Sequence, residues 1–187
     1  MRRSQPRLVW LALFLATSAA LATSAVAFAP TPTLATRAAG TATAVPRLGR
    51  SVAVVNIPSI GVNVPLLYGI HDDALSRGLG LWPGTSLPGR PGNAVIAGHR
   101  TSHGAPMRDI DKLAIGDLIY VTTTGKKQSV LEYRITKRQV VRPDAMWITR
   151  PTRTATLTIF ACHPPHSIAY RYVVFAKLIS QRTSGGQ

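Results

Sequence analysis

The stretch TATLTIFACHPPHSIAYRYVVF, residues 154–175, decides the fold and the chemistry that we expect for this chain. It holds the only cysteine, Cys162, between two strand-like runs at 155–161 and 171–179. Arg171 is the first residue of the second run, and the eight residues 163–170 form the predicted loop between the runs. If the two runs form antiparallel neighbours, Cys162 and Arg171 face a common cleft.

A histidine stands at the end of another predicted strand. The continuous apolar run 93–97 indicates a buried strand and leads into Gly98, His99 and Arg100. A cysteine thiol, with a reference pKa of about 8.5, needs a nearby cation or dipole to act as a nucleophile at neutral pH. We therefore predict acyl transfer through a thioester, in which His99 moves a proton to the leaving amine and an arginine stabilises the developing charge. Spacing alone also allows two non-catalytic interpretations. Arg171 could be a solvated residue at a sheet edge, and His99 could be a turn residue.

The rest of the domain predicts an all-β fold. From residue 52 onward, Gly and Pro interrupt short apolar runs every eight to twelve residues, which is typical of a sandwich or barrel. Together the runs favour a closed barrel of roughly eight strands with one or two short helices. The predicted strands are 52–58, 62–67, 93–97, 116–122, 129–136, 140–141, 155–161 and 171–179, and the predicted helical turns are 72–78, 107–113 and 144–149.

The N-terminus predicts export. Three arginines, at positions 2, 3 and 7, precede an uncharged and largely apolar run that continues to residue 29 and is long enough to cross a bilayer. We expect residues 1–29 to form a single-pass membrane helix with the catalytic domain on the extracellular face. A cleaved signal peptide is the alternative, since small residues stand at 25–27 and 27–29. Residues 30–50 then form a Thr, Ala and Pro-rich linker, 51–180 the domain, and 181–187 a disordered tail.

The net charge and the single cysteine limit the possible binding partners of the protein and the possible roles of its thiol. The net charge of +15, from 22 Lys and Arg against 7 Asp and Glu, favours anionic partners such as nucleic acid, lipid headgroups or cell-wall polymer. Export argues against nucleic acid, and a merely basic soluble surface remains an alternative reading of the charge. An exported chain with one cysteine cannot form an intramolecular disulfide, so the thiol is either functional, inert and buried, or bonded to another chain.

A zinc site is the competing interpretation of these side chains. His99 and His103 are four residues apart, and Cys162, His163 and His166 lie close together in the sequence. Glycines beside the first pair disfavour the helix that would align the two histidines, and the Cys-His-Pro-Pro-His order matches no common zinc spacing. We therefore predict no metal and no cofactor.

Five segments in order make the domain resemble the sortases, the membrane-anchored cysteine transpeptidases of Gram-positive bacteria. They are NIPSIGV at 56–62, LWPGT at 81–85, PGNAVIAGHR at 91–100, LAIGD at 113–117, and LTIFACHP at 157–164 followed by Arg171. The AGHRTSHGAP form at 97–106 is most similar to the class E and class F sortases of actinobacteria.

The resemblance implies an eight-stranded barrel in which Cys162 is the nucleophile, His99 the general acid/base and Arg171 the group that positions substrate or stabilises the oxyanion. It implies cleavage of an LPXTG-like or LAXTG-like signal between Thr and Gly. The acyl group of a surface protein then passes to an amine on a peptidoglycan precursor or a pilin lysine, which anchors that protein to the cell wall.

The sequence departs from the family pattern next to the nucleophile. Ala161 stands where the family usually has Thr, and His103 where related sequences carry an aromatic residue. We expect Ala161, His103, Arg100 and His163 to contact substrate. Loss of the hydroxyl at position 161 also leaves a second hypothesis open, a catalytically degenerate barrel that binds sorting peptides or anionic cell-wall polymer.

Overall fold

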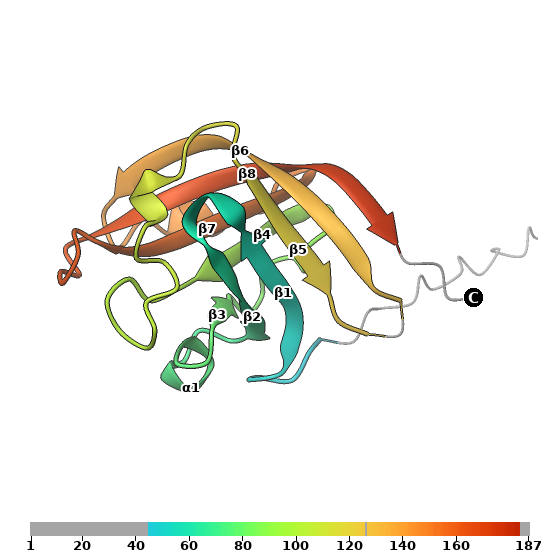
Figure 1. The fold of residues 1–187 in the computed structure, drawn as a ribbon, viewed down its shortest axis with the longest axis horizontal. Coiled ribbons are helices and arrows are strands. Elements are labelled where there is room, and N and C mark those ends of the chain that lie inside the picture. Colours follow the sequence, from blue (N-terminus) through green and yellow to red (C-terminus); the bar gives the residue numbers. More distant parts are fainter. Residues whose placement is uncertain (1–44, 126, 184–187) are drawn as a thin grey trace, which may run out of the picture. The chain divides into compact units, whose positions relative to one another are not determined.

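Eight strands close into a barrel in the computed structural model, which describes residues 45–125 and 127–183 (Figure 1). Neighbours around the barrel follow the order β1-β2-β3-β4-β7-β8-β6-β5. The pairs β2–β3 and β4–β7 are parallel and the other pairs are antiparallel. This confirms the predicted all-β closed barrel. The strands are β1 (Ser51–Ile57), β2 (Val62–Tyr68), β3 (Leu79–Leu81), β4 (Gly92–Ala97), β5 (Leu118–Thr123), β6 (Ser129–Val141), β7 (Ala155–His163) and β8 (Tyr170–Thr183).

Helical structure within the described residues is limited to single turns between strands. Three of these turns lie inside segments predicted as helical, but each is shorter than predicted. The fourth, η1, lies where the predicted strands 52–58 and 62–67 meet. Pro58 ends β1, and the turn that it opens closes at Gly61, whose φ of 65° suits glycine. The turns are η1 (Pro58–Ile60), α1 (Asp72–Leu75), η2 (Ile110–Lys112) and η3 (Met146–Thr149).

Alternation along the strands sorts side chains between the barrel interior and its outer surface. On β7, Leu157, Ile159 and Ala161 belong to the main core cluster. Phe160 and Cys162 therefore point to the outer face, because successive side chains of a strand point to opposite sides. Phe160 packs there in a second, smaller apolar cluster beneath η3. The nucleophile candidate thus lies outside the barrel core.

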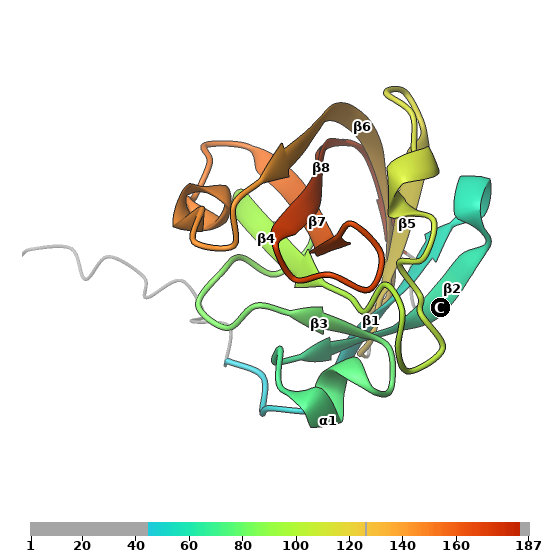
Figure 2. The same ribbon diagram turned by 90° about the vertical axis from the view of Figure 1, so that its left-hand side faces the viewer.

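Strand β4 is buried along its whole length, which explains its continuous apolar sequence. It runs parallel to β7, with Ala97 opposite Phe160. In Figure 2 the two strands lie side by side. At Gly98, a Cβ atom would come within 2.5 Å of a Leu79 methyl and 2.6 Å of Met107 Cγ, so only glycine fits. Close packing therefore fixes the backbone immediately before His99.

The predicted membrane helix, residues 1–29, lies outside the described residues. Within 45–125 and 127–183, no helix is long and apolar enough to cross a bilayer. The last residues of the predicted linker are described and pair with the end of β2. Gly49 N–H donates to Tyr68 O at 2.7 Å, and Tyr68 N–H donates to Arg50 O at 2.9 Å.

The C-terminal strand is longer than the sequence indicates. The predicted tail begins at residue 181, whereas β8 continues to Thr183. There Arg182 pairs with Val130 and Thr183 with Ser129 of β6. At this end of β8 the side chains on both faces of the strand are exposed and polar. The alternation of apolar and polar residues that predicts a strand is therefore absent here.

Candidate active site

Cys162, His99 and Arg171 line one cavity of about 310 Å³ on the outer face of the barrel. Cys162 and Arg171 are register partners on the antiparallel strands β7 and β8. His99 lies two residues after Ala97, the last residue of β4. Cys162 likewise lies two residues after Phe160, which is the register partner of Ala97 on β7. The parallel pairing of β4 with β7 therefore brings His99 level with Cys162. The sequence-predicted trio is thus assembled at one site by backbone pairing.

Apolar side chains form the walls of this cavity, and sequence reasoning did not identify them. They come from α1 and the connection before it, from the residue after β3, from β7, and from the β6–β7 connection that contains η3. Trp82 and Phe160 face each other with ring centroids 6.0 Å apart. Ordinary apolar residues in short runs carry no signal that separates a cleft wall from a core. The wall residues are Ile70, Leu75, Trp82, Ala145, Met146, Ile148 and Phe160.

A buried asparagine ties one wall of the cavity to the barrel. Asn93 of β4 is 5% exposed, and its Nδ2 donates to Ile148 O at 2.8 Å and to Arg150 O at 3.3 Å. Its Oδ1 accepts a hydrogen bond from Thr158 Oγ1 at 2.8 Å. The amide therefore fixes the η3 wall against β4 and β7.

Replacing Asn93 with Ala is expected to lower the free energy of unfolding by about 2–3 kcal/mol, because it leaves the Ile148 carbonyl and the Thr158 hydroxyl without their partner. Chemical denaturation measures the change. The matched variant Thr158→Val removes only one of these bonds and should cost less. An Asn93→Ala protein as stable as the parent would contradict this role.

Arg171 is held by the loop that precedes it. Its Nη1 donates to Ile168 O and to Tyr170 O, each at 2.9 Å. Among the described residues, no carboxylate forms an ion pair with Arg171. One guanidinium nitrogen therefore orients the group, and its positive charge stays uncompensated beside Cys162. Such a fixed, uncompensated donor suits a developing oxyanion.

His99 is half-buried beside a second histidine. The rings of His99 and His103 lie 4.9 Å apart. Burial, reinforced by the charge of His103, lowers the pKa of His99 below its ordinary 6.5, while Asp72 acts in the opposite direction. The buried Nε2 atom of His99 has no hydrogen-bond partner among the described residues. The neutral ring is therefore favoured at neutral pH, and no protein group holds that nitrogen in one protonation state.

Two substitutions should move the pKa of His99 in opposite directions. His103→Asn removes a repulsive charge and should raise it, while burial keeps it below 6.5. Asparagine also tolerates the positive φ of 49° at position 103. Asp72→Asn removes a favourable charge and should lower the pKa further. NMR titration of the His99 ring measures both, and shifts of the same sign in the two variants would contradict the assignment.

Arg100, which the sequence predicts to contact substrate, is not among the residues that line the cavity. It is 3% exposed and forms an ion pair with Asp111 of η2. Its Nε donates to Arg108 O at 3.2 Å, and its Nη1 lies 2.7 Å from His163 Nδ1. Arginine can only donate, so His163 Nδ1 accepts this bond. Arg100 and His163 thus fasten the β4–β5 connection to β7, on the barrel side away from Cys162.

The remaining two predicted contact residues are placed differently again. The side chain of Ala161, 2% exposed, belongs to the barrel core, although the residue borders the cavity. A hydroxyl at position 161 would therefore meet core side chains rather than substrate. His103 is exposed in a neighbouring groove and approaches the site only through His99. Neither residue presents its side chain to the floor of the cavity.

The zinc interpretation lacks a ligand set in the described part of the chain. No three His, Cys, Asp or Glu side chains of these residues are grouped so that they could hold a metal ion. His163 Nδ1, one of the proposed ligands, is occupied by Arg100.

Comparisons with known proteins agree with this geometry. The family described as Sortase domain matches residues 55–179. Sortase SrtE1 of Streptomyces coelicolor is 31% identical over 159 residues, which cover 72% of this chain and 42% of that protein. The chain therefore spans less than half the length of this relative.

Solved structures give the same picture. A crystal structure of sortase E1 from Streptomyces coelicolor with a tripeptide in the active site is 29% identical, with a TM-score of 0.66, covering 72% of this chain and 91% of that one. A Clostridium perfringens sortase D5 transpeptidase is 34% identical, with a TM-score of 0.64 and coverage of 72% and 82%.

Proposed function

The chain belongs to the sortase family, and we propose that it is a cysteine transpeptidase that cleaves an LPXTG-like sorting signal between Thr and Gly. One observation carries the proposal. Cys162, His99 and Arg171 line one cavity, and the first and last are register partners on neighbouring strands. A nucleophile, a proton carrier and a fixed cation are the groups that acyl transfer requires.

The first half of the reaction forms a thioester. His99 takes the thiol proton, and Cys162 Sγ attacks the carbonyl carbon of the substrate Thr. The carbonyl oxygen gains negative charge, which the Arg171 guanidinium stabilises. When the tetrahedral intermediate collapses, the C–N bond to Gly breaks and His99 returns its proton to the leaving amine. The low pKa of His99 makes the protonated ring a good acid for this step.

The second half transfers the acyl group. An amine attacks the thioester carbon, and neutral His99 accepts the proton that the amine loses. The C–S bond breaks, a new amide forms, and Cys162 recovers the proton from His99. Arg171 stabilises the oxyanion in this step as in the first. The net reaction exchanges one amide for another, so it needs no cofactor or oxidant.

The cavity walls support a peptide substrate with apolar residues ahead of the scissile bond. Trp82, Met146 and Ile148 line the cavity and offer apolar contacts. Such walls suit the Leu-Pro or Leu-Ala portion of an LPXTG or LAXTG signal. The substrates that we propose are surface proteins with such a C-terminal signal. The acceptor is the amine of a peptidoglycan precursor or a pilin lysine.

We also propose that the protein acts at the extracellular face of the cell membrane of a Gram-positive bacterium. The support is the sequence, in which three arginines precede the apolar run that ends at residue 29.

The test uses the full-length protein, an LPXTG or LAXTG peptide and an added amine, with products identified by mass. We expect cleavage after Thr and an amine-exchanged peptide. The degenerate-barrel alternative is distinguished by the same assay, because a binding module would retain the peptide without changing its mass. Peptide recovered intact from a folded protein whose thiol reacts with an alkylating reagent would overturn the proposal.

A further inference from the structure

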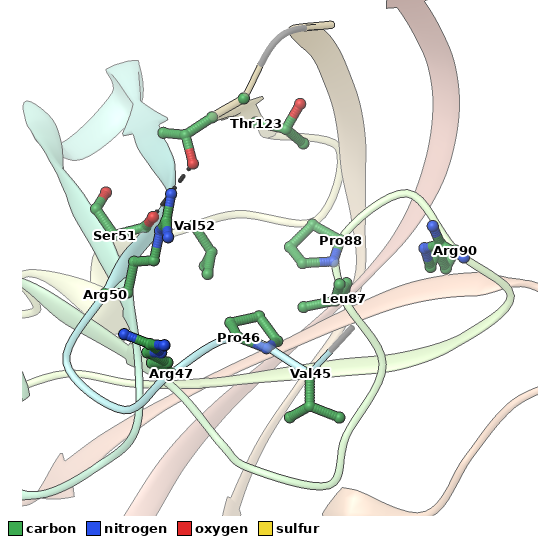
Figure 3. Close-up of a pocket in the computed structure, with 12 residues that line it drawn as sticks. Val45, Pro46, Arg47, Arg50, Ser51, Val52, Leu87, Pro88, Arg90 and Thr123 are labelled. Atoms are coloured by element: carbon green, nitrogen blue, oxygen red, sulfur yellow. Dashed lines mark hydrogen bonds between the residues drawn. The ribbon is translucent and has the colours of Figure 1, made fainter. Parts of the chain in front are cut away.

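A second and larger cavity, of about 640 Å³, lies at the opposite end of β4 from His99. It forms between the segment that leads into β1, the loop that precedes β4, and the end of β5 (Figure 3). Arg90 lies two residues before β4 begins, whereas His99 lies two residues after it ends. A six-residue strand, about 20 Å long, thus separates the two sites.

Three arginines surround this cavity. Figure 3 shows Arg47 and Arg50 on one side and Arg90 on the other. All three are exposed, and none has a side-chain hydrogen bond or ion pair with another described residue. None of the described lining residues is Asp or Glu. The cavity therefore concentrates positive charge with nothing to neutralise it, which favours an anionic ligand.

The hydroxyl groups of the lining are already used within the protein. Thr124 Oγ1 donates to Ser51 O at 3.2 Å, and Thr123 Oγ1 donates to Ser129 O at 3.4 Å. The arginine guanidiniums are thus the donors available to a ligand. Guanidinium groups bind phosphate with paired, charge-assisted hydrogen bonds. These donors fit a phosphate group.

The arginines stand beside exposed apolar side chains. In the segment before β1, Val45 is 75% exposed and Leu48 is 61% exposed, and they alternate with Arg47 and Arg50. Further apolar lining comes from Pro46, Val52, Leu87 and Pro88. Exposed apolar residues interleaved with arginines are typical of surfaces that lie at a membrane interface. The lining thus suits a ligand with a phosphate at one end and hydrocarbon at the other.

The sequence places this segment close to an apolar run. Fifteen residues, 30–44, separate Val45 from the run that ends at residue 29. Fifteen residues in any conformation span at most about 50 Å. A membrane that held the apolar run would therefore lie within reach of this cavity.

We propose that this cavity binds the headgroup phosphate of an anionic phospholipid, with Arg47, Arg50 and Arg90 as its ligands. Val45 and Leu48 contact the hydrocarbon below the headgroup. The contact presents the end of the barrel where β4 begins to the bilayer, and the cavity that contains Cys162 faces away from it. This inference concerns a separate site and does not depend on the transpeptidase activity.

Calorimetric titration of the full-length protein, kept in nonionic detergent, tests the proposal. The probes are dihexanoyl phosphatidylglycerol, dihexanoyl phosphatidylcholine and glycerol phosphate, each below any concentration at which it self-associates. We expect the phosphatidylglycerol to bind at least about fivefold more tightly than either of the other two, because only it combines a net negative charge with hydrocarbon. Its affinity should fall as salt rises.

Removing the arginines should remove this preference. The triple variant Arg47→Gln/Arg50→Gln/Arg90→Gln is expected to bind phosphatidylglycerol about tenfold or more weakly, and each single variant about two- to fivefold more weakly. Arg134→Gln, an exposed arginine of β6 outside the cavity lining, is the matched control and should leave the affinity unchanged. Peptide cleavage by the triple variant should match that of the parent, since none of the three residues lines the catalytic cavity.

Three outcomes would overturn the proposal. Equal affinity for the two lipids would show that the negative headgroup is not recognised. Full affinity in the triple variant would show that the arginines are not the ligands. Glycerol phosphate binding as tightly as the lipid would identify a soluble phosphate as the ligand instead. A protein that binds the lipid but cleaves no peptide would refute the transpeptidase and leave this inference standing.

Discussion

Replacing Cys162 with Ala is expected to abolish peptide cleavage and amine transfer, with a loss of at least about 10⁴-fold in rate. Cys162 supplies the only thiol of the chain, so no other residue can form the thioester. Its side chain is half-buried on the outer face of β7, away from the main core, so the fold should persist. Mass analysis of peptide incubated with each protein measures the loss.

A thermal melt of the Cys162→Ala protein is the control, and its midpoint should match that of the parent within a few degrees. Cys162→Ser retains the shape of the side chain but offers a poorer nucleophile, so it should also be nearly inactive. Retention of more than a small percentage of the parent rate in a folded Cys162→Ala protein would contradict the nucleophile assignment.

Replacing Arg171 with Ala is expected to lower kcat by about 10²–10³-fold, the effect typical of losing an oxyanion donor. The guanidinium is fixed by the carbonyls of Ile168 and Tyr170, and Arg171 is the register partner of Cys162. Arg171→Lys keeps the positive charge but loses the planar guanidinium with its paired N–H donors, so its kcat should lie between those of Arg171→Ala and the parent. Steady-state kinetics with an LPXTG peptide measures both variants.

Arg142 offers a matched control for Arg171. It also borders the cavity, but its side chain is largely exposed and pairs with Asp144 at 3.5 Å. Arg142→Ala should therefore lower the rate less than about tenfold. Equal losses in Arg142→Ala and Arg171→Ala would indicate a general dependence on positive charge and would contradict a specific role for Arg171.

The pairing of Cys162 with Arg171 could be predicted from sequence because the two strands are consecutive. Two apolar runs joined by a short loop favour antiparallel neighbours, which brings the ends of the runs together. His99 was different, because β4 and β7 form a long-range parallel pair whose register partners, such as Ala97 and Phe160, are 63 positions apart in the sequence. Residue type and a position at a strand end made His99 a candidate, and the resemblance to a family implied the same role, but no local pattern predicted the pairing that brings it to Cys162.

The structure places two of the predicted contact residues, Arg100 and Ala161, in positions that the sequence did not indicate, and each has its own physical reason. Arg100 is buried because Asp111 and His163 compensate its charge and its donors. Ala161 replaces the Thr that the family usually has before the nucleophile, and alternation along β7 sends its side chain into the core. Partners distant in the sequence decided the first case, and the face of a strand decided the second.

Strand β3 was missed for a different reason. Its three residues, Leu79–Leu81, are too few to show a period, and glycines at positions 78 and 80 are typical of a turn. The structure shows why glycine is required at position 80, where a Cβ atom would come within 2.4 Å of the Gly69 carbonyl oxygen. Close approach of two backbones, which no local pattern reveals, selected this residue.

The central claim is that Cys162 carries the acyl group between donor and acceptor. Its most direct test is the intact mass of the full-length protein, quenched in acid while it turns over an LPXTG peptide without added amine. We expect an increase equal to the mass of the peptide fragment that ends at Thr, and fragmentation should locate it on Cys162. Peptide consumption with no such adduct, or an adduct on another residue, would contradict the claim.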